Sequence, residues 1–474
     1  MRRRTPSASG PARRACALAA AAAMALSLAA CSPSTTPESN KAQLAAPGSW
    51  LVPMQGERDV SAVAGAYPMK LQSPTAEGTW AYLDGATSFN AAVDRQLLAA
   101  LDKHTGAHYQ PAVETARQDK ARLSVQGTIV HTGGHYLIGR LQITPHGPGT
   151  TAETTMVYDS ATGTTVPSEA LVAPAHRGEL AALIRTLRGA DATAPVPLTD
   201  LAFDAAGNLT VPTTPANRAM GTLRIPAAAV RPWLSTLGRH AQDDADEPWK
   251  PPAPAPKQLR HINCDIVPCA ALTYDDGPSQ ATTPRLLKML EQAGAGATFF
   301  AVGGAVSYSP LIARAEHDAG FTVGNHSWNH PDLRRLSPAA VATQMQWTNS
   351  AIKAATGAAP TLMRAPYGGV DAMVQQNVGL PIILWSVDSL DWLSRDPAKY
   401  IPTIMRLVSP GAVILEHDIH ATTVDHQGEV ISRLQNAGYY LVTVPQLFAG
   451  ITLQPGQVYR CRGHGRQCTP SPGR

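Results

Sequence analysis

Two histidines and two aspartates in this chain of 474 residues have types and spacing suited to metal chemistry. His326 and His330 are four residues apart in the stretch His-Ser-Trp-Asn-His, which places both imidazoles on one face of a turn if the stretch is helical. Together with a carboxylate they form a set with one open position, which suits a catalytic divalent metal, zinc by default. Asp275 and Asp276 are adjacent, so that one can bind the metal while the other stays free as a base. The stretch lacks the glutamate of His-Glu-x-x-His, which counts against a metalloprotease of that type.

Further polar residues fall at intervals along the second half of the chain. The three later clusters are Arg364, Pro366 and Tyr367; Asp388, Asp391 and Trp392; and His417 with Asp418. Taken singly, each cluster also fits a turn or a strand end. Their regular recurrence after apolar runs is what favours a single shared site.

The apolar runs and helical patterns of this half alternate, which predicts β/α units. The expected strands are 267–274, 297–302, 321–324, 361–364, 382–387, 412–415 and 440–444, and the expected helices are 284–292, 311–319, 339–355, 372–377, 398–407 and 429–436. Strands that are separated by helices favour a parallel sheet. Seven such units in about 190 residues favour a small or incomplete (β/α) barrel, in which chemistry lies at the carboxyl ends of the strands. All the polar clusters follow such strand ends.

Taken together, the clusters resemble the motifs of the polysaccharide deacetylase family, also known as the NodB-homology or carbohydrate esterase 4 family. The five motifs occur in family order as Thr273-Tyr-Asp-Asp-Gly-Pro278, His326-Ser-Trp-Asn-His330, Arg364-Ala-Pro-Tyr367, Asp388-Ser-Leu-Asp-Trp392 and Leu415-Glu-His-Asp418. Tyr274 stands where phenylalanine is usual, a change on a strand that should not affect the chemistry. The resemblance covers about residues 265–450 and implies the distorted (β/α)7 barrel of that family.

The resemblance also implies a role for each motif residue. Asp276, His326 and His330 would bind the metal, either zinc or another divalent ion such as cobalt. Asp275 would act as the general base, and Arg364 would pair with it and keep it ionised.

The other implied roles concern the leaving group and the pocket. His417 would protonate the leaving amine, and Asp391 would hold its imidazole in the charged form. The backbone N–H of Tyr367 would stabilise the oxyanion. Trp392 and Leu415 would form the wall of the pocket for the acetyl methyl group.

The first thirty residues read as an export signal. Five arginines precede an uncharged run rich in alanine and leucine from Ala15 to Ala30, too short for a transmembrane helix. The run ends in Leu28-Ala29-Ala30-Cys31, which resembles a lipobox in which Cys31 is lipidated; the alternative is an ordinary cleavage site beside an incidental cysteine. We therefore expect an extracytoplasmic protein, anchored by lipid to the cell membrane and facing the cell wall.

Charge and cysteine content agree with export. The net charge of +4 includes the five arginines of the signal, so the remainder has 34 basic and 35 acidic residues, which argues against a nucleic-acid partner. Beyond Cys31 lie Cys264, Cys269, Cys461 and Cys468, which are disulfide candidates in an oxidising compartment. Their pairing stays open, since four cysteines allow three pairings. A zinc site built from the two pairs is the competing interpretation.

Composition divides the chain into six segments. They are a lipoprotein signal peptide (1–30), a flexible spacer (31–48), an α+β accessory domain (49–240), a proline-rich linker (241–258), the deacetylase domain (259–450) and a basic C-terminal tail (451–474). The accessory domain has no catalytic constellation, so we expect it to bind or position a partner. Its ligand and the oligomeric state stay open.

The expected activity is removal of N-acetyl groups from N-acetylglucosamine residues of a cell-wall glycan, with peptidoglycan as the most economical substrate for an exported deacetylase. Two alternatives remain. The same residues would serve an O-acetyl esterase that acts on acetylated xylan. The protein could also be an inactive lipoprotein that binds glycan.

Overall fold

The computed structural model describes residues 51–52, 62–113, 122–147, 149–188, 196, 198–212, 222–254 and 259–463. The chain divides into two compact units, residues 1–46 and 47–474, and every described residue belongs to the second. The predicted signal, the spacer, Cys31 and Cys468 lie outside the described residues. No helix of the described ranges has the length and apolar character needed to cross a membrane.

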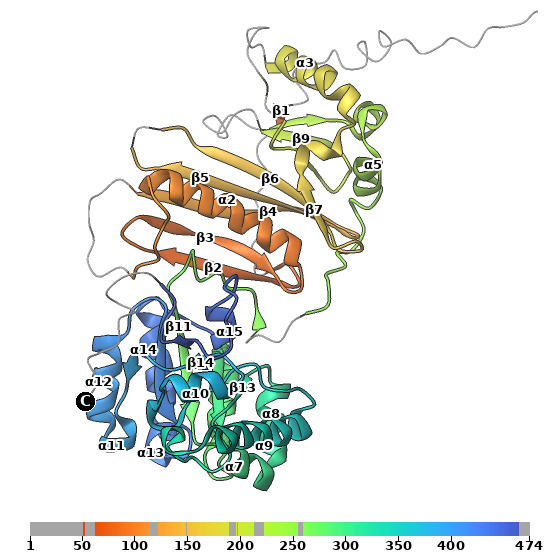
Figure 1. Ribbon diagram of the computed structural model, residues 1–474. Helices are drawn as coiled ribbons and strands as arrows, with labels where there is room; N and C mark the ends of the chain where they lie inside the picture. The colour runs from red at the N-terminus through yellow and green to blue at the C-terminus, as the bar shows by residue number, and fades with distance from the viewer. Residues whose placement is uncertain are drawn as a thin grey trace, which may run out of the picture. The chain divides into compact units, whose positions relative to one another are not determined.

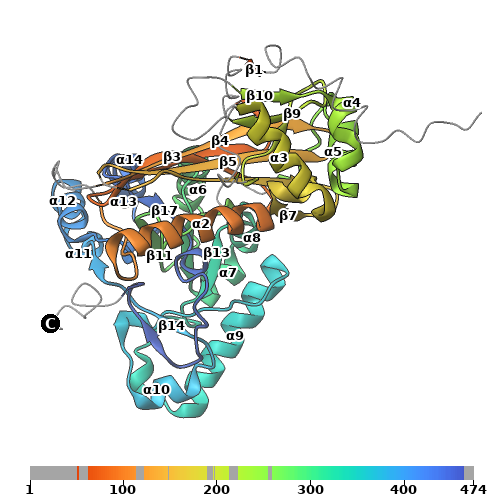
Figure 2. The ribbon, with the colours of Figure 1, turned by 90° about the horizontal axis from the view of Figure 1, so that it is seen from above.

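The first part of the described chain is built on a six-stranded sheet. Its strands lie in chain order: β2 Ala66–Gln72, β3 Ala76–Leu83, β4 Leu123–Gly133, β5 Tyr136–Pro145, β6 Ala152–Asp159 and β7 Thr164–Pro167. Neighbours are antiparallel except β3 and β4, which are parallel because helix α2 (Thr87–Thr105) connects them. Helix α2 covers one face of this sheet (Figures 1 and 2) and buries Phe89, Val93, Leu97 and Leu101, which lie on one helical face.

A second, smaller sheet follows in the same α+β region. Its order is β1 (Leu51–Val52), β10 (Thr222–Ile225), β9 (Leu209–Pro212) and β8 (Ala202–Phe203), all antiparallel. The same region contains helices α3 (Arg177–Arg188), α4 (Ala227–Val230) and α5 (Thr236–Asp243).

The segment predicted as a linker differs from a free spacer over its described part. Helix α5 extends into it, the N–H of Gly134 donates to the carbonyl of Glu247 at 3.1 Å, and the N–H of Lys250 donates to the carbonyl of Gly134 at 2.8 Å. The indole N–H of Trp249 donates to the carbonyl of Ala64 at 3.0 Å. These long-range bonds fix residues 244–250 against the first α+β region, which composition alone does not reveal.

The C-terminal region, residues 259–463, contains a parallel sheet. Its path is β13 (Thr322–Asn325), β12 (Ala297–Ala301), β11 (Cys269–Asp275), β16 (Ala412–His417) and β15 (Val387–Asp388), with β17 (Tyr440–Leu441) also paired to β11. A separate parallel pair joins β14 (Ile382–Ile383) to β18 (Val458–Tyr459). All seven residues of β11 are buried, as expected for the centre of a parallel sheet that helices cover on both faces. The predicted α/β class is confirmed.

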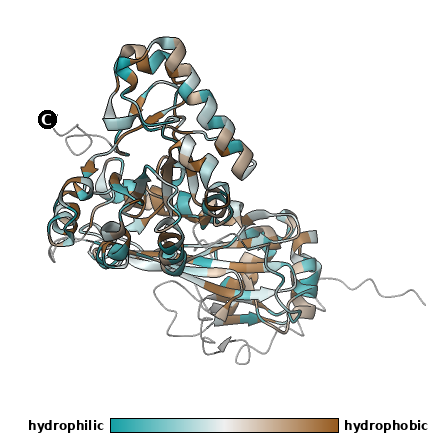
Figure 3. Ribbon diagram, turned by 90° about the horizontal axis from the view of Figure 1, so that it is seen from below, coloured by the Kyte–Doolittle hydropathy of each residue, from teal (hydrophilic) through white to brown (hydrophobic). Residues whose placement is uncertain are grey.

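Ten helices alternate with or follow these strands in the described C-terminal region. They are α6 Thr283–Ala293, α7 Gly303–Tyr308, α8 Pro310–Asp318, α9 Pro338–Thr356, α10 Ala372–Asn377, α11 Asp391–Ser394, α12 Pro397–Leu407, α13 Ala421–Asp425, α14 Gln427–Asn436 and α15 Val444–Leu447. Helices α6, α8, α9 and α12 have proline in their first turn, where its missing N–H costs nothing. Hydrophilic and hydrophobic residues both occur along the helices of the molecule (Figure 3), and α6, for example, buries Leu286, Leu287 and Leu290.

The described strands do not close into a barrel. The predicted strand 361–364 is reduced to Met363, which forms isolated bridges to Asn325 on one side and to Ile382 on the other. Pro360 and Pro366 flank this segment, and proline has no N–H to donate to a ladder. The predicted strand 382–387 is likewise split into β14 and β15.

Cys264 and Cys269 form a disulfide at the start of β11. Cys461 is also disulfide-bonded. Sulfurs joined in this way are not free thiolates for the alternative zinc site.

Candidate metal and acid–base site

The end of β11 carries the two adjacent aspartates. Asp275 is the last residue of the strand and is buried, whereas Asp276 follows it with φ 76°, in the left-handed region. This turn of the backbone separates the two carboxylates. Asp275 Oδ2 lies 3.6 Å from His326 Nε2, while Asp276 Oδ1 lies 3.6 Å from His326 Nε2 and 3.4 Å from His330 Nε2. Both carboxylates therefore face the histidine pair.

Asp276, His326 and His330 form a possible metal site. One ligand atom from each lies within 4.8 Å of the other two, and no other group of this kind occurs among the described residues. His326 Nδ1 is 2.8 Å from the carbonyl of Arg364, which can only accept, so Nδ1 carries the proton and Nε2 presents its lone pair to the cluster. Burial lowers the pKa of His330, and the neighbouring His326 lowers it further, which favours the neutral imidazole that metals bind. Two imidazoles and a carboxylate fit a divalent ion.

The histidine pair lies on a loop rather than on a helical turn. This loop begins where β13 ends at Asn325, and Ser327 and His330 have φ 64° and 59°. The Asn325 side chain accepts from the N–H of Ser327 at 2.8 Å, and the Ser327 hydroxyl accepts from the N–H of His330 at 3.1 Å. Side chains thus supply the bonds that a helix would have made between backbone groups, so the condition of a helical turn, under which the four-residue spacing places both imidazoles on one face, is not met.

Arg364 holds Asp275 from the side opposite the histidines. The Arg364 side chain is fully buried and donates to Asp275 Oδ1 at 2.7 Å, to the carbonyl of Ile383 at 2.9 Å and to the carbonyl of Leu384 at 3.3 Å. Its guanidinium also lies 4.2 Å from the centre of the Phe300 ring. Burial lowers the pKa of Arg364 from its ordinary value, and the Asp275 charge opposes that change. The guanidinium remains charged, since arginine is not deprotonated in proteins.

His417 and Asp391 form a second buried acid–base pair. His417 Nδ1 lies 2.9 Å from Asp391 Oδ1, and the backbone N–H of His417 donates to Asp391 Oδ2 at 2.9 Å. Burial lowers the pKa of His417, but the hydrogen bond and charge of Asp391 outweigh it and raise the pKa to about 9. His417 therefore carries a proton at neutral pH.

The three residues expected to bind substrate or the oxyanion differ in exposure. Tyr367 has φ 59° and a side chain 68% exposed, and its ring centre lies 4.5 Å from that of His330. Trp392 is 45% exposed, and its indole N–H reaches Asp388 Oδ1 at 3.4 Å. Leu415 is buried in β16 and pairs with Asp388 of β15. Tyr367 thus adjoins the histidines directly, whereas Trp392 and Leu415 gather around Asp388.

Backbone strain marks the same region. All six non-glycine residues with positive φ among the described residues are Asp276, Ser327, His330, Tyr367, Leu390 and Arg395. Five of them lie within a motif, and the sixth, Arg395, lies three residues after Trp392. Left-handed backbone at residues with side chains costs about 1–3 kcal/mol each and persists where the surrounding structure fixes it.

Sequence reasoning missed the residues that hold Asp391. Thr423 donates to Asp391 Oδ2 at 2.8 Å from helix α13, and Ser389 donates to Asp391 Oδ1 at 3.1 Å. Ser389 also accepts from the N–H of Asp391 at 3.2 Å, a local turn that its position two residues earlier could have indicated. Thr423 lies in no motif, and no pattern in the sequence pointed to it.

The fold and the site together define a parallel α/β domain with a possible His–His–Asp metal site between two buried acid–base pairs. A profile of the polysaccharide deacetylase family matches residues 263–380. Peptidoglycan-N-acetylglucosamine deacetylase PgdA of Listeria monocytogenes is 41% identical over 189 residues, which are 40% of this chain and 40% of the Listeria protein. Chitooligosaccharide deacetylase of a Bradyrhizobium species is 34% identical over 194 residues, which cover 37% of this chain and 89% of that protein.

The solved structure of peptidoglycan deacetylase PdaC from Bacillus subtilis has 39% sequence identity and a TM-score of 0.38, and the match covers 39% of this chain and 92% of that one. The chain belongs to the polysaccharide deacetylase family, which confirms the resemblance to that family. The family is metal-dependent, in agreement with the possible ligand set. The match spans only 40% of the length of the Listeria relative.

Proposed function

We propose that this chain is a metal-dependent hydrolase that removes N-acetyl groups from N-acetylglucosamine residues of peptidoglycan. The observation that carries the proposal is the convergence of a His–His–Asp ligand set with the Arg364–Asp275 and His417–Asp391 pairs. Family membership and 41% identity to a peptidoglycan-N-acetylglucosamine deacetylase support the substrate. Hydrolysis adds water to the acetyl carbonyl and breaks the C–N bond, giving acetate and a free amine.

Asp276, His326 and His330 would hold the metal, with zinc as the first ion to test. When bound, such an ion polarises a carbonyl and lowers the pKa of water. Asp275 would accept the proton of the attacking water as the general base. Its Oδ1 is engaged by Arg364, and its Oδ2 faces the histidine pair, so Oδ2 is the oxygen in position to take the proton.

His417 would protonate the leaving amine, since it is charged at neutral pH and held by Asp391. The backbone N–H of Tyr367 would donate to the oxyanion that forms on the acetyl carbonyl, in a position fixed by its left-handed backbone. Trp392 and Leu415 would enclose the acetyl methyl group. This arrangement places the base and the acid in separate hydrogen-bonded pairs, Arg364–Asp275 and His417–Asp391.

We also propose that the C-terminal region is a distorted (β/α)7 barrel. Met363 bridges β13 and β14 and thereby stands in for a strand, which supports that interpretation. The proposed location is the outer side of the cell membrane, with a lipid on Cys31 after removal of the signal peptide, and the sequence of residues 1–31 supports it.

The test is acetate release by the full-length protein with added zinc. It is offered N-acetylglucosamine oligomers, peptidoglycan glycan strands and acetylated xylan, and the peptidoglycan digest is then analysed by mass spectrometry. We expect release from the first two and loss of acetyl groups on glucosamine. Release from xylan alone would identify an O-acetyl esterase instead. Glycan binding by a folded protein without hydrolysis, with every divalent metal tried, would refute the enzymatic proposal.

A further inference from the structure

The segment 454–462, which we call the C-terminal strap, pairs with β14, the strand whose end contacts Arg364. Strand β18 of the strap runs parallel to β14. The N–H of Ile382 donates to the carbonyl of Gln457 at 2.9 Å, and the N–H of Leu384 donates to the carbonyl of Tyr459 at 2.8 Å. The sequence had indicated a basic tail over residues 451–474, yet the strap is part of the folded C-terminal region.

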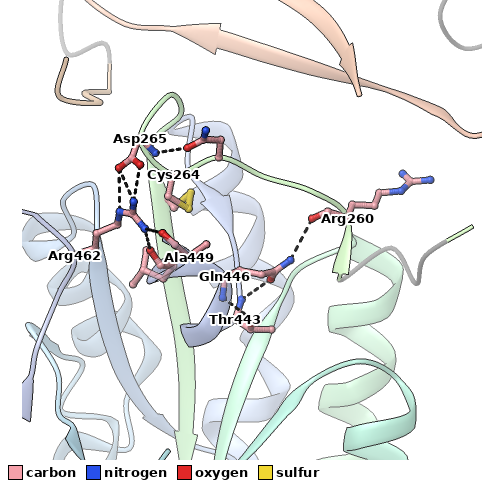
Figure 4. The surroundings of a disulfide bond; sticks show 10 residues. Arg260, Cys264, Asp265, Thr443, Gln446, Ala449 and Arg462 are labelled. Atoms are coloured by element: carbon pink, nitrogen blue, oxygen red, sulfur yellow. Dashed lines mark hydrogen bonds and ion pairs between the residues drawn. A yellow bond between two sulfur atoms is a disulfide. The ribbon is translucent and has the colours of Figure 1, made fainter. Parts of the chain in front are cut away.

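Arg462 fastens the end of the strap (Figure 4). Its guanidinium donates to Asp265 Oδ1 at 2.6 Å and Oδ2 at 2.7 Å, and to the carbonyls of Leu447 and Ala449 at 2.6 and 2.8 Å. Its backbone N–H donates to the carbonyl of Gly411 at 2.9 Å. The Arg462 side chain is 11% exposed and that of Asp265 is 38% exposed, so the charge-assisted bonds between them are partly shielded from water.

The anchor of Arg462 is itself held in place. Asp265 is adjacent to Cys264, whose disulfide to Cys269 ties it to the first residue of β11. The N–H of Asp265 also donates to the Asn263 side chain at 2.9 Å. Gly411 leaves room for the strap, because a Cβ there would lie 1.8 Å from the carbonyl oxygen of Arg462.

The opposite side of β14 meets the candidate active site. The carbonyls of Ile383 and Leu384 accept from Arg364, whose third bond goes to Asp275. Leu384 links the two sides in one residue, since its N–H is bonded to the strap and its carbonyl to Arg364. A shift of β14 would therefore move the acceptors that orient the Arg364 guanidinium.

We propose that the strap positions Arg364, and through it the base Asp275, with Arg462 and Asp265 as positioning residues that touch neither metal nor substrate. The inference rests on the proposed function for its kinetic consequence. The hydrogen bonds between strap and β14 can be tested without any activity. Misplacing a catalytic group by about 1 Å lowers rates by up to ~100-fold, so a small displacement of β14 is enough to be measured.

The kinetic test compares Arg462→Ala and Arg462→Lys with wild type in the full-length, zinc-loaded protein, with an N-acetylglucosamine oligomer as substrate. We expect kcat to fall about tenfold or more in Arg462→Ala, with KM within about twofold. Lysine keeps the charge but cannot donate to both carboxylate oxygens of Asp265 as arginine does. The kcat of Arg462→Lys should therefore lie between those of wild type and Arg462→Ala. Arg433→Ala, which removes an exposed pair with Glu429, is the control and should leave kcat unchanged.

The second test is backbone hydrogen exchange of the segment around Ile382 and Leu384, followed by mass spectrometry. In Arg462→Ala these amides should exchange about tenfold faster or more, while β12 exchanges as in wild type. Unchanged exchange at β14 would overturn the inference even if the wild type proved inactive. Faster exchange with unchanged kcat would overturn it as well and leave the strap a structural element only. A wild type that releases no acetate would refute the proposed function, whereas the exchange measurement would still decide the role of the strap.

Discussion

Two buried arginine–aspartate pairs lie in two different regions of the molecule and have similar geometry. In the first α+β region, Arg140 of β5 donates to Asp200 Oδ1 at 2.7 and 2.8 Å. In the C-terminal region, Arg364 donates to Asp275 Oδ1 at 2.7 Å. Asp200 also accepts from Thr155 of the neighbouring strand β6, a structural contact within the sheet. Asp275 instead turns its other oxygen toward His326.

The comparison shows that a buried ion pair does not by itself mark an active site. The Arg140–Asp200 pair instead joins β5 to the segment before β8, and breaking a buried pair costs stability. The Arg364–Asp275 pair differs in its surroundings, because a possible ligand set and a protonated histidine lie beside it. Experiments that affect one pair and leave the other intact separate these two roles.

Removal of metal should have the largest effect, and only in the C-terminal region. Dialysis against a chelator should lower acetate release to below detection, and added zinc should restore it, because the described ligands are confined to Asp276, His326 and His330. Hydrogen exchange of β5 should not change. Full activity after measured loss of metal would contradict the assignment of the ligand set.

Asp275→Asn should have the next largest effect. The amide keeps the size of the side chain but cannot accept a proton, so acetate release should fall by about 10²–10⁴-fold. Metal content, measured by elemental analysis, should match that of wild type because Asp276 and the histidines are unchanged. A rate near that of wild type would show that another group is the base.

Asp391→Asn should lower the rate less than Asp275→Asn does and should shift the pH dependence of kcat. His417 must be protonated to act as an acid, so activity is lost as pH rises through its pKa, which Asp391 raises to about 9. Without the Asp391 charge the pKa falls, and the basic limb of kcat should move down by about one pH unit or more, which lowers the rate about twofold at pH 8 and about tenfold at pH 10. Bound metal shifts both proteins alike, so the difference between their profiles is the measurement. Superimposable basic limbs would remove His417 as the acid.

Asp200→Asn makes the same chemical change in the other pair and should have the smallest effect on catalysis. It replaces the carboxylate that Arg140 contacts with a neutral amide and should lower the free energy of unfolding by about 1–3 kcal/mol. At a temperature well below the melting transition, kcat should equal that of wild type. A large loss of kcat in a folded variant would mean that the first region takes part in catalysis.

Much of the C-terminal region could be predicted because its signals are local. Helix α10 has the predicted bounds 372–377, and α9 extends the predicted range by one residue at each end. Proline at helix starts and glycine after helix ends, such as Gly357 with φ 85°, fix these limits within a few residues. The motif residues were identified for a similar reason, since they follow strands whose burial pattern is visible in the sequence.

The parts that were not predicted depend on partners far along the chain. Arg462 and Asp265 are 197 residues apart, and composition showed only a basic tail near one and a cysteine beside the other. The loop at His326 takes a non-helical path because Asn325 and Ser327 bond to its backbone, which spacing alone cannot indicate. Met363 forms only isolated bridges, because the flanking prolines cannot donate to a strand ladder and its partners lie in the distant strands β13 and β14.

The pairing of β14 with the strap also sets an order of events during synthesis of the chain. β14 emerges well before residues 457–459, so for that interval the N–H groups of Ile382 and Leu384 have no strand to bond. An unpaired edge of this kind invites pairing with other chains. If the strap positions Arg364 as proposed, the guanidinium reaches its final position only once the strap has paired with β14, and chains that lack residues 457–459 should have low activity.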